Sequence, residues 1–479
     1  MRCEIKFGIA AQCINLLKSH LMTIRKRKLA ALSQSFEPLP MEYEPTEEKL
    51  TASAGLGPVL DLFLDDPLFS ELCACLPPRR SNASYNTEKF AIILLAGFLK
   101  GYDCLEDLDQ FHNDPLLLEK LGELPTSRAI GDWLRDFEPT QIARLQSFLK
   151  LQAQTARLQI DPKAPLVIDI DSSSHVQHGI KMEGLGYDYD GNWCLSSLMC
   201  SDELLFAHAF QLRAGNTFSC VNSATMIEGV FSHLKYTDKK YGRADSAFCN
   251  QEFVEECIRN GAKFTVTAHG NTLWETKISS ITEWKPWAFD PKELKTFAEK
   301  KISPPLIELG SFIYQPGWSE NLRFYIIVKR TWGKDHTTGE ERWFHYGVLT
   351  NWNLFENSLQ HVMEFHHKRG HSGENSIKEF KYAFDLLHFP CQRLSANTVY
   401  GLFALIAHNH LRTIALLDNR ENPLYAKRLR FKLINQPGKI ISHSRKIIGK
   451  FSIALMKEVK ATITAWTATR TTVFLTRAG

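Results

Sequence analysis

The stretch Leu166-Val-Ile-Asp-Ile-Asp171, followed by three serines at 172–174, is an apolar run that carries two carboxylates. An apolar run that ends in small polar residues predicts a short buried strand. Because side chains alternate along a strand, Asp169 and Asp171 are expected on the same face. Burying a carboxylate costs free energy unless it is paired or binds a metal. The run leaves two interpretations open. In the first, one carboxylate caps a turn and the other forms an ion pair in the core. In the second, the carboxylates belong to a metal site.

The composition is that of an ordinary globular protein. The 479 residues are 44% hydrophobic and 23% charged, which predicts about two to four domains with well-buried cores. The eleven cysteines are scattered without a CxxC pair, which favours reduced thiols and argues against disulfides or a zinc site. The longest clean apolar run, Phe90 to Leu99, is too short to span a bilayer. We therefore expect a cytoplasmic protein without membrane contact.

Positive charge gathers at both ends of the chain. Residues 1–30 hold seven Lys/Arg and one acid, and residues 411–479 hold fourteen Lys/Arg and three acids. Because the net charge of the whole chain is only +4, the middle is net negative. Basic ends suit a polyanion such as DNA, although solvated tails have the same composition. An amphipathic helix is expected over residues 7–17.

The first third of the chain is predicted to be helical. Residues 1–54 are interpreted as a basic N-terminal segment and a proline-broken linker, and residues 55–160 as a helical region. Within it, Thr126 and Ser127 are expected to cap a short helix, and Pro139 to open another. Two short helices across a turn can form a helix-turn-helix. Residues 55–160 are therefore a candidate DNA-binding domain.

Residues 161–270 predict the first part of an α/β core. Strands are expected at 192–200 and 203–212, joined by a tight turn at Ser201-Asp202 and followed by a loop over 213–216. The elements expected next are a helix over 223–234, a strand over 241–245, a helix over 251–259 and a strand over 263–267. This order predicts a mixed sheet with flanking helices and right-handed crossovers.

A different pattern occupies residues 271–360. They hold seven of the ten tryptophans, and strands are expected at 312–315, 322–329 and 343–349. We interpret them as an inserted, mainly β subdomain. A helix is then expected from about residue 372 in the second part of the core, residues 361–410. A basic C-terminal region, residues 411–479, completes the chain.

Three acids carry the strongest signal for chemistry. Asp171 and Asp245 each end a predicted strand, and Glu374 opens a predicted helix. Like charges a few ångströms apart repel each other unless a cation neutralises them. Carboxylate oxygens suit Mg²⁺ or Mn²⁺, and two such ions about 4 Å apart can clamp the attacking and leaving oxygens of a phosphoryl transfer. Lys378 and Lys381, on the helix face of Glu374, are expected to hold a phosphate backbone.

Other polar residues carry weaker signals. Asp169 is the other carboxylate of the first strand, and the residues alone do not decide whether Asp169 or Asp171 is the structural one. Glu379 faces away from Glu374 on a helix, so it is a lower-ranked candidate. His175 and His178 have a spacing that suits a metal, but an ordinary polar loop is the favoured interpretation.

Four motifs in order resemble the signature of DDE transposases of bacterial insertion sequences. They are Asp-Ile-Asp171-Ser-Ser, Leu-Arg213-Ala-Gly-Asn216, Arg243-Ala-Asp245-Ser-Ala-Phe and Glu374-x3-Lys378-x2-Lys381. The chain is most similar to the branch that has a β insertion before the catalytic Glu and a Tyr-Arg-Glu-Lys motif around it. The resemblance runs from about residue 55 to about residue 450.

The resemblance implies an RNase H-like core, preceded by an all-α N-terminal domain. Asp171, Asp245 and Glu374 would bind two Mg²⁺ (or Mn²⁺) ions. The implied activity is cut-and-paste transposition, in which a dimer on double-stranded DNA cleaves at terminal inverted repeats and joins the ends to target DNA in the nucleoid. The DNA-binding residues that the resemblance implies are Arg213, Arg243, Arg369, Lys378 and Lys381.

One segment departs from the family motif. The motif has three residues between Arg and Glu, whereas four separate Arg369 from Glu374, and His366 stands at the tyrosine position. We expect a loop over residues 370–373 that takes Arg369 out of the motif's register. An inactive or repurposed relative that binds DNA therefore stays open as an alternative. A hydrolase of small phosphoesters would keep the acids but leave the basic ends unexplained.

Overall fold

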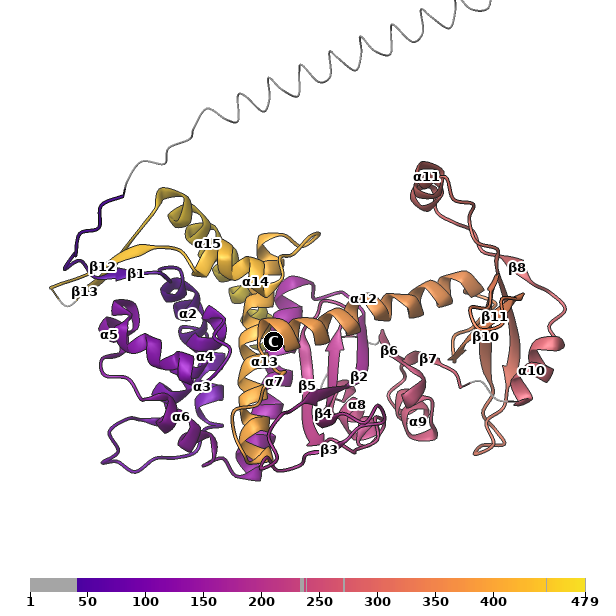
Figure 1. Ribbon diagram of the computed structural model, residues 1–479, viewed down its shortest axis with the longest axis horizontal. Coiled ribbons are helices and arrows are strands. Elements are labelled where there is room, and N and C mark those ends of the chain that lie inside the picture. Colours follow the sequence, from indigo (N-terminus) through magenta and orange to yellow (C-terminus); the bar gives the residue numbers. More distant parts are fainter. Residues whose placement is uncertain (1–40, 233–236, 238, 270–271, 445, 479) are drawn as a thin grey trace, which may run out of the picture. The chain divides into compact units, whose positions relative to one another are not determined.

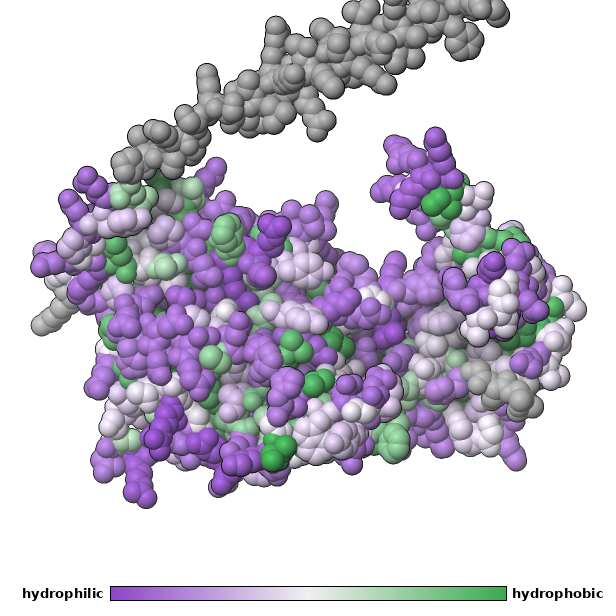
Figure 2. Space-filling view, viewed as in Figure 1, coloured by the Kyte–Doolittle hydropathy of each residue, from purple (hydrophilic) through white to green (hydrophobic). Residues whose placement is uncertain are grey.

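The computed structural model describes residues 41–232, 237, 239–269, 272–444 and 446–478 (Figure 1). Residues Lys49–Gly479 form one compact unit, and residues 41–48 are exposed chain in a second one. The helix expected over residues 7–17 lies outside the described residues. Within them, no helix is long and apolar enough to cross a membrane. On the face shown in Figure 2, hydrophobic side chains are scattered in small groups among hydrophilic ones.

A ten-stranded mixed sheet is the centre of the fold, in the order β3-β4-β2-β6-β7-β11-β10-β9-β8, with β5 also paired to β4. β2 runs parallel to β6 and antiparallel to β4, and β6 runs parallel to β7. The strands are β2 (Leu166–Val176), β3 (Gly186–Tyr187), β4 (Trp193–Asp202), β5 (Ala207–Ala214), β6 (Lys240–Ala244), β7 (Lys263–Thr267), β8 (Lys285–Pro286), β9 (Ile307–Tyr314), β10 (Phe324–Lys334) and β11 (Glu341–Thr350).

The two faces of β2 contact different helices. Ile168 and Ile170 are buried in a core with α8 (Ser223–Phe231) and α9 (Gln251–Arg259). On the other face, Asp169 and Asp171 contact α12 (Leu359–Ala383). The alternation of side chains along a strand explains this division, because the apolar and acidic positions differ by one residue. The expectation that both carboxylates share a face is confirmed.

Long and short helices supply a second core. Within it, α7 (Pro139–Ile160) and α13 (Leu394–Asp418) pack on each other and on β5. The shorter N-terminal helices share this core with α13 and α15 (Ile453–Ala478). They are α2 (Leu56–Leu64), α3 (Leu68–Cys73), α4 (Thr87–Lys100), the 3-10 helix η1 (Glu106–Asn113), α5 (Pro115–Leu121) and α6 (Ser127–Leu134). Thr126 caps α6 and Pro139 opens α7, as expected.

The region 271–360 extends the central sheet. Its last strand, β11, pairs antiparallel with β7, and β10 and β9 follow outward. Two helices, α10 (Thr272–Ser279) and α11 (Pro291–Lys300), belong to the same region. The remaining elements are α14 (Ala426–Leu429), the π-helix η3 (Arg430–Ile434), and a small sheet of β1 (Leu50–Thr51), β12 (Gly438–His443) and β13 (Lys446–Phe451). The fold is therefore mixed α/β, with a large mixed sheet and many helices, whereas the predicted domain boundaries stay predictions.

Four local predictions were wrong. Asp171 does not end its strand, because β2 continues through the three serines to Val176. The tight turn at Ser201-Asp202 is part of β4, because the buried Asp202 accepts hydrogen bonds from Arg157 and His208, each at 2.8 Å. The loop over 213–216 begins only after Ala214, where β5 ends. The loop over 370–373 is a continuous part of α12, which begins at Leu359 rather than near residue 372.

Candidate active site

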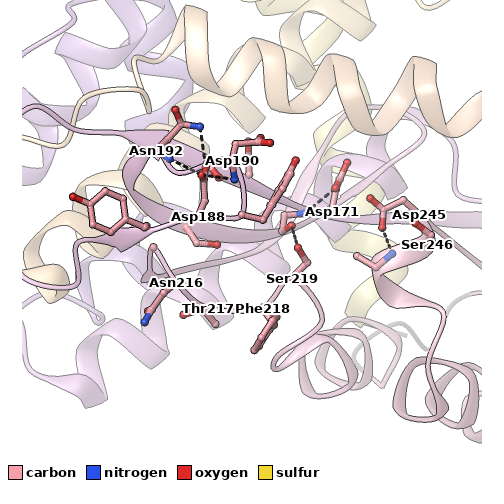
Figure 3. Close-up of a pocket in the computed structure, with 18 of the residues that line it drawn as sticks. Asp171, Asp188, Asp190, Asn192, Asn216, Thr217, Phe218, Ser219, Asp245 and Ser246 are labelled. Carbon is pink, nitrogen blue, oxygen red and sulfur yellow. Dashed lines mark hydrogen bonds between the residues drawn. The ribbon is translucent and has the colours of Figure 1, made fainter. Parts of the chain in front are cut away.

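A cavity of about 810 Å³ lies beside the second half of β2 and the carboxyl end of β6 (Figure 3). Its walls come from Ser196 of β4 and from five other segments far apart in the sequence. They are Asp171 to Ser174 of β2, residues 187–192 before β4, residues 215–219 after β5, Asp245 to Ala247 after β6, and Lys381 of α12. The largest of the cavities described here therefore includes two of the three predicted acids.

Strand pairing brings Asp171 and Asp245 together. Asp169 lies opposite Arg243 in the parallel β2–β6 register, and Asp171 and Asp245 each follow two residues later. Parallel neighbours bring residues at equal offsets to the same edge of the sheet. The Asp245 carboxylate caps the short 3-10 helix η2 (Ser246–Phe248) by accepting a hydrogen bond from the Ala247 amide at 2.9 Å. The Asp171 carboxylate accepts one from the Ser172 amide at 2.8 Å.

The electrostatics of Asp171 are those of a partly desolvated carboxylate beside another acid. Burial and, to a smaller extent, the nearby Asp245 raise the pKa of Asp171 to about 6, although Arg369 opposes both. Removing water and adding a like charge both disfavour the ionised form. A cation in the cavity would relieve both effects.

Asp169 has a different role from Asp171 on the same face. Its side chain is 1% exposed and accepts hydrogen bonds from Nε and Nη2 of Arg243 at 2.7 and 2.8 Å, and from Ser372 of α12. Arg243 also donates to the Phe365 carbonyl at 3.0 Å. The core ion pair that the sequence left open is therefore formed by Asp169, and the guanidinium of Arg243 is buried away from DNA.

Arg213 is also buried. It donates to the carbonyls of Phe218, Ser219 and Val221 at 2.9 to 3.4 Å, and to the Ser196 hydroxyl at 3.0 Å. These bonds hold the chain after β5 against the cavity wall. Arg213 therefore fixes the loop that lines the cavity, and its guanidinium is not exposed to a ligand in this structure.

The continuous helix α12 places Arg369 and Glu374 differently. Arg369 Nη1 lies 3.2 Å from Asp171 Oδ2, with both side chains mostly buried. Glu374 follows Arg369 by five residues, which turn a helix by about 140° beyond a full turn. The Glu374 side chain therefore leaves α12 in a different direction from that of Arg369. Its side chain is 52% exposed, its carboxylate lies 3.9 Å from Lys378, and it does not line the cavity. In the described ranges, no three His, Cys, Asp or Glu side chains converge in a way that could hold a metal.

The two lysines of α12 differ in the same manner. Lys381 lines the cavity and donates to the Ser174 carbonyl at 2.8 Å, and its burial lowers the pKa of the ammonium group. Lys378 is mostly exposed beside Glu374. Of the five residues predicted to bind DNA, Lys381 is the one that reaches the cavity wall.

His366 belongs to a hydrogen-bonded group that the sequence did not reveal. Its Nδ1 is 3.0 Å from the Thr265 hydroxyl, and its Nε2 is 2.9 Å from the Tyr346 hydroxyl and 3.1 Å from that of Thr267. Burial lowers the pKa of His366 to about 3. A neutral imidazole therefore joins α12 to β7 and β11, and a tyrosine hydroxyl from β11 stands beside the histidine.

Several residues of the cavity were missed from the sequence. Asp188, Asp190, Asn216 and Phe218 line it, although only Asn216 lay in a recognised motif. Asp188 organises its own turn by accepting hydrogen bonds from the Asp190 and Asn192 amides. No local signal distinguishes such a turn from an ordinary surface loop.

The two histidines with metal-like spacing have no common ligand. His175 is buried and its ring nitrogens contact the Leu386 carbonyl and the Ser197 hydroxyl. Burial lowers the pKa of His175 to about 3. His178 is exposed on the following loop. The expected polar loop is wrong for His175, which is a buried residue of β2, whereas His178 does lie on a loop.

Comparison with known families identifies the family of this chain. Residues 47–465, which are most of the chain, match the family described as transposase DDE domain group 1. No curated protein matches the chain. The match over residues 47–465 shows that the chain belongs to the DDE transposase family.

Proposed function

We propose that this protein is an active cut-and-paste transposase of a bacterial insertion sequence. It would bind the terminal inverted repeats of its element, cleave the DNA there, and join the freed ends to target DNA. The observation that carries this proposal is the convergence of Asp171 and Asp245 in one cavity with a raised pKa at Asp171. That arrangement is costly for stability and useful for binding a cation.

The cavity fits an oxygen-ligated divalent cation. Asp171 and Asp245 supply carboxylate oxygens, which suit Mg²⁺ or Mn²⁺. Arg369 Nη1 lies 3.2 Å from Asp171 Oδ2, so a bound cation would compete with this guanidinium for the carboxylate. When bound, two such ions would supply Lewis-acid stabilisation of the attacking and leaving oxygens of a phosphodiester.

Glu374 is the proposed third acid. Lys381 follows it by seven residues, which is close to two helical turns, so the two side chains leave α12 on the same side. Lys381 lines the cavity, and the exposed Glu374 side chain is free to change rotamer. Glu374 would turn toward the cavity and complete the set of ligands with Asp171 and Asp245.

The residues of the chain have distinct proposed tasks in cleavage. Asp171 and Asp245 orient the metal-binding oxygens, and the Lys381 ammonium holds a nonbridging oxygen of the scissile phosphate. Arg369, which pairs with Asp171 in the metal-free protein, and the exposed Lys378 would contact the DNA backbone. Synapsis of two element ends would require a dimer on double-stranded DNA in the nucleoid, without contact to a membrane.

Cleavage of a labelled duplex that carries an element end tests this proposal. Asp171→Asn and Glu374→Gln are expected to abolish Mg²⁺-dependent cleavage while each variant binds the duplex as wild type does. Undiminished cleavage by either variant would contradict the assignment of that residue.

A DNA-binding relative without chemistry is the second candidate. The extra residue between Arg369 and Glu374 favours it, because it leaves Glu374 outside the cavity in this structure. Binding of element ends by the wild-type protein, without nicking in either Mg²⁺ or Mn²⁺, would support this candidate and contradict the first.

A further inference from the structure

A second concave surface lies next to the carboxyl-terminal end of α12. It is a groove of about 580 Å³ between the ends of α4 and α12 and the segment α14–η3. We call it the α12–η3 groove. The residues that define it are Lys100, Tyr382, Lys427, Arg428, Phe431 and Asn435.

Two aromatic side chains of the groove are open to solvent. Tyr382, near the end of α12, and Phe431, in the π-helix η3, are each 72% exposed. Single exposed aromatic residues are common on protein surfaces. Two of them in one groove, on two separate elements, form a surface on which flat rings can stack.

The groove also carries positive charge that the protein does not neutralise. Lys427 and Arg428 are exposed on α14, and neither forms an ion pair with any residue that the structure describes. Lys100 does not add to this charge, because it contacts Asp114 at 4.0 Å and donates to the Ser53 hydroxyl at 3.1 Å. Asp103 is the acid that lines the groove. The groove therefore presents two unpaired cations beside two exposed rings.

Buried Arg430 fixes this surface to α12. Its Nε and Nη2 donate to the carbonyls of Leu99 and Phe98 at 3.1 and 2.7 Å, and Nη1 donates to that of Ala383. These carbonyls lie at the ends of α4 and α12, where helices have no backbone partners for their last carbonyl groups. The Arg430 guanidinium also lies over the Phe384 ring at 4.4 Å. The segment with Phe431 is thereby held against the helix that carries Lys381.

We propose that the α12–η3 groove binds a single-stranded stretch of DNA next to the cleavage cavity. Lys427 and Arg428 contact phosphates, and Tyr382 and Phe431 stack on unpaired bases. Exposed aromatic rings between cations favour single-stranded DNA, because a duplex keeps its base faces covered. Tyr382 directly follows Lys381, so the groove and the cavity lie on neighbouring faces of the same end of α12. The inference rests on the proposed function in taking DNA as the ligand.

Fluorescence anisotropy with the full-length protein, without a divalent metal, tests the inference. The probes are a labelled oligothymidylate and a blunt duplex of equal length. Phe431→Ala and Tyr382→Ala are each expected to weaken oligothymidylate binding about tenfold, because a base stack on an aromatic ring is lost. Duplex binding is expected to change less than about twofold, since it does not use the rings. Phe431→Trp keeps a ring and is expected to retain the affinity.

The cationic half of the groove is tested through the salt dependence. Lys427→Ala/Arg428→Ala is expected to reduce the slope of log affinity against log salt by about 1.4 for the single strand, because two phosphate contacts are lost. Lys163→Ala/Lys181→Ala removes two exposed lysines outside the groove and is the matched control, with an unchanged slope expected.

Unchanged oligothymidylate binding in both aromatic variants would overturn the inference. An equal loss for single strand and duplex would also overturn it, because stacking on unpaired bases predicts a difference. Cleavage of an element end by the same wild-type preparation separates this outcome from the proposed function. Failure of wild type to cleave in Mg²⁺ contradicts the proposed function. The anisotropy results alone decide whether the groove binds single-stranded DNA.

Discussion

Asp169 and Asp171 lie two residues apart on one face of β2, and their surroundings are opposite. Asp169 is fully buried and its oxygens accept two charge-assisted bonds from Arg243 and one from Ser372. Asp171 opens into a cavity, has one contact with an arginine at 3.2 Å, and faces a second acid. The first carboxylate is neutralised by the protein, whereas the second is left short of positive charge. The two acids therefore differ in that one is paired inside the protein and the other lines a cavity.

The difference comes from the helix that crosses β2. Ser372 lies where α12 contacts β2, so Asp169 is sealed between the helix and Arg243. Asp171 lies beyond this contact, at the edge where β2 meets the cavity. The positions of two residues relative to one helix therefore decide which acid is available.

The largest expected effect is on stability when the buried pair is broken. Asp169→Asn leaves the Arg243 guanidinium buried without a counter-charge, which is expected to lower the free energy of unfolding by roughly 3–5 kcal/mol. Chemical denaturation monitored by circular dichroism measures it. Asp171→Asn is the matched control and is expected to be at least as stable as wild type at neutral pH. Equal destabilisation by both variants would contradict the claim that Asp169 is a structural acid and Asp171 is not.

A smaller effect is expected in the pH dependence of stability. The pKa of Asp171 is raised to about 6 in the folded protein, above its ordinary value near 4 in an unfolded chain. The folded state therefore binds the proton more tightly, so this contribution to stability is complete below about pH 4 and is lost as the pH rises through about 6. The loss is at most about 3 kcal/mol.

Denaturation of wild type and Asp171→Asn over this pH range checks the sign and size of the effect. The difference in unfolding free energy between the two is expected to grow from pH 4 to pH 7 in favour of the variant. A difference independent of pH would mean that Asp171 titrates in its ordinary range.

The smallest expected effect concerns Arg369. Because its guanidinium favours the ionised form of Asp171, Arg369→Gln should move the pH midpoint described above to a higher value. The free energy of unfolding at neutral pH is expected to fall by about 1 kcal/mol or less, since the cost of removing both charges from water offsets most of their attraction. Lys163→Gln, on an exposed turn, is the control. An unchanged midpoint would show that the contact with Asp171 is not formed in solution.

Sequence reasoning recovered the parts of the fold that depend on local pattern. The bounds of α9 and β7 agree with the expected ranges, and Asp245 directly follows a strand. The alternation in β2 predicted a shared face for its two acids. These features need only a period of two or 3.6 residues and a turn signal to be recognised.

The missed features depend on contacts between distant segments. Gly370 and Gly373 suggested a loop, since glycine costs about 1 kcal/mol within a helix. The helix continues because it packs on β2, where a methyl group on Gly373 would touch Asp169. The contacts of Arg369 with Asp171 and of Tyr346 with His366 likewise join different elements. No local pattern in the sequence specifies them.

Binding of Mn²⁺ to the DNA-free protein tests the central claim most directly. Titration followed by the electron paramagnetic resonance signal of free Mn²⁺ is expected to show uptake by wild type. Asp171→Asn and Asp245→Asn are expected to weaken it at least about tenfold, whereas Asp132→Asn, an exposed residue of α6, leaves it unchanged. Equal uptake by all four proteins, or none by wild type, would contradict the assignment of Asp171 and Asp245 as the cation-binding pair.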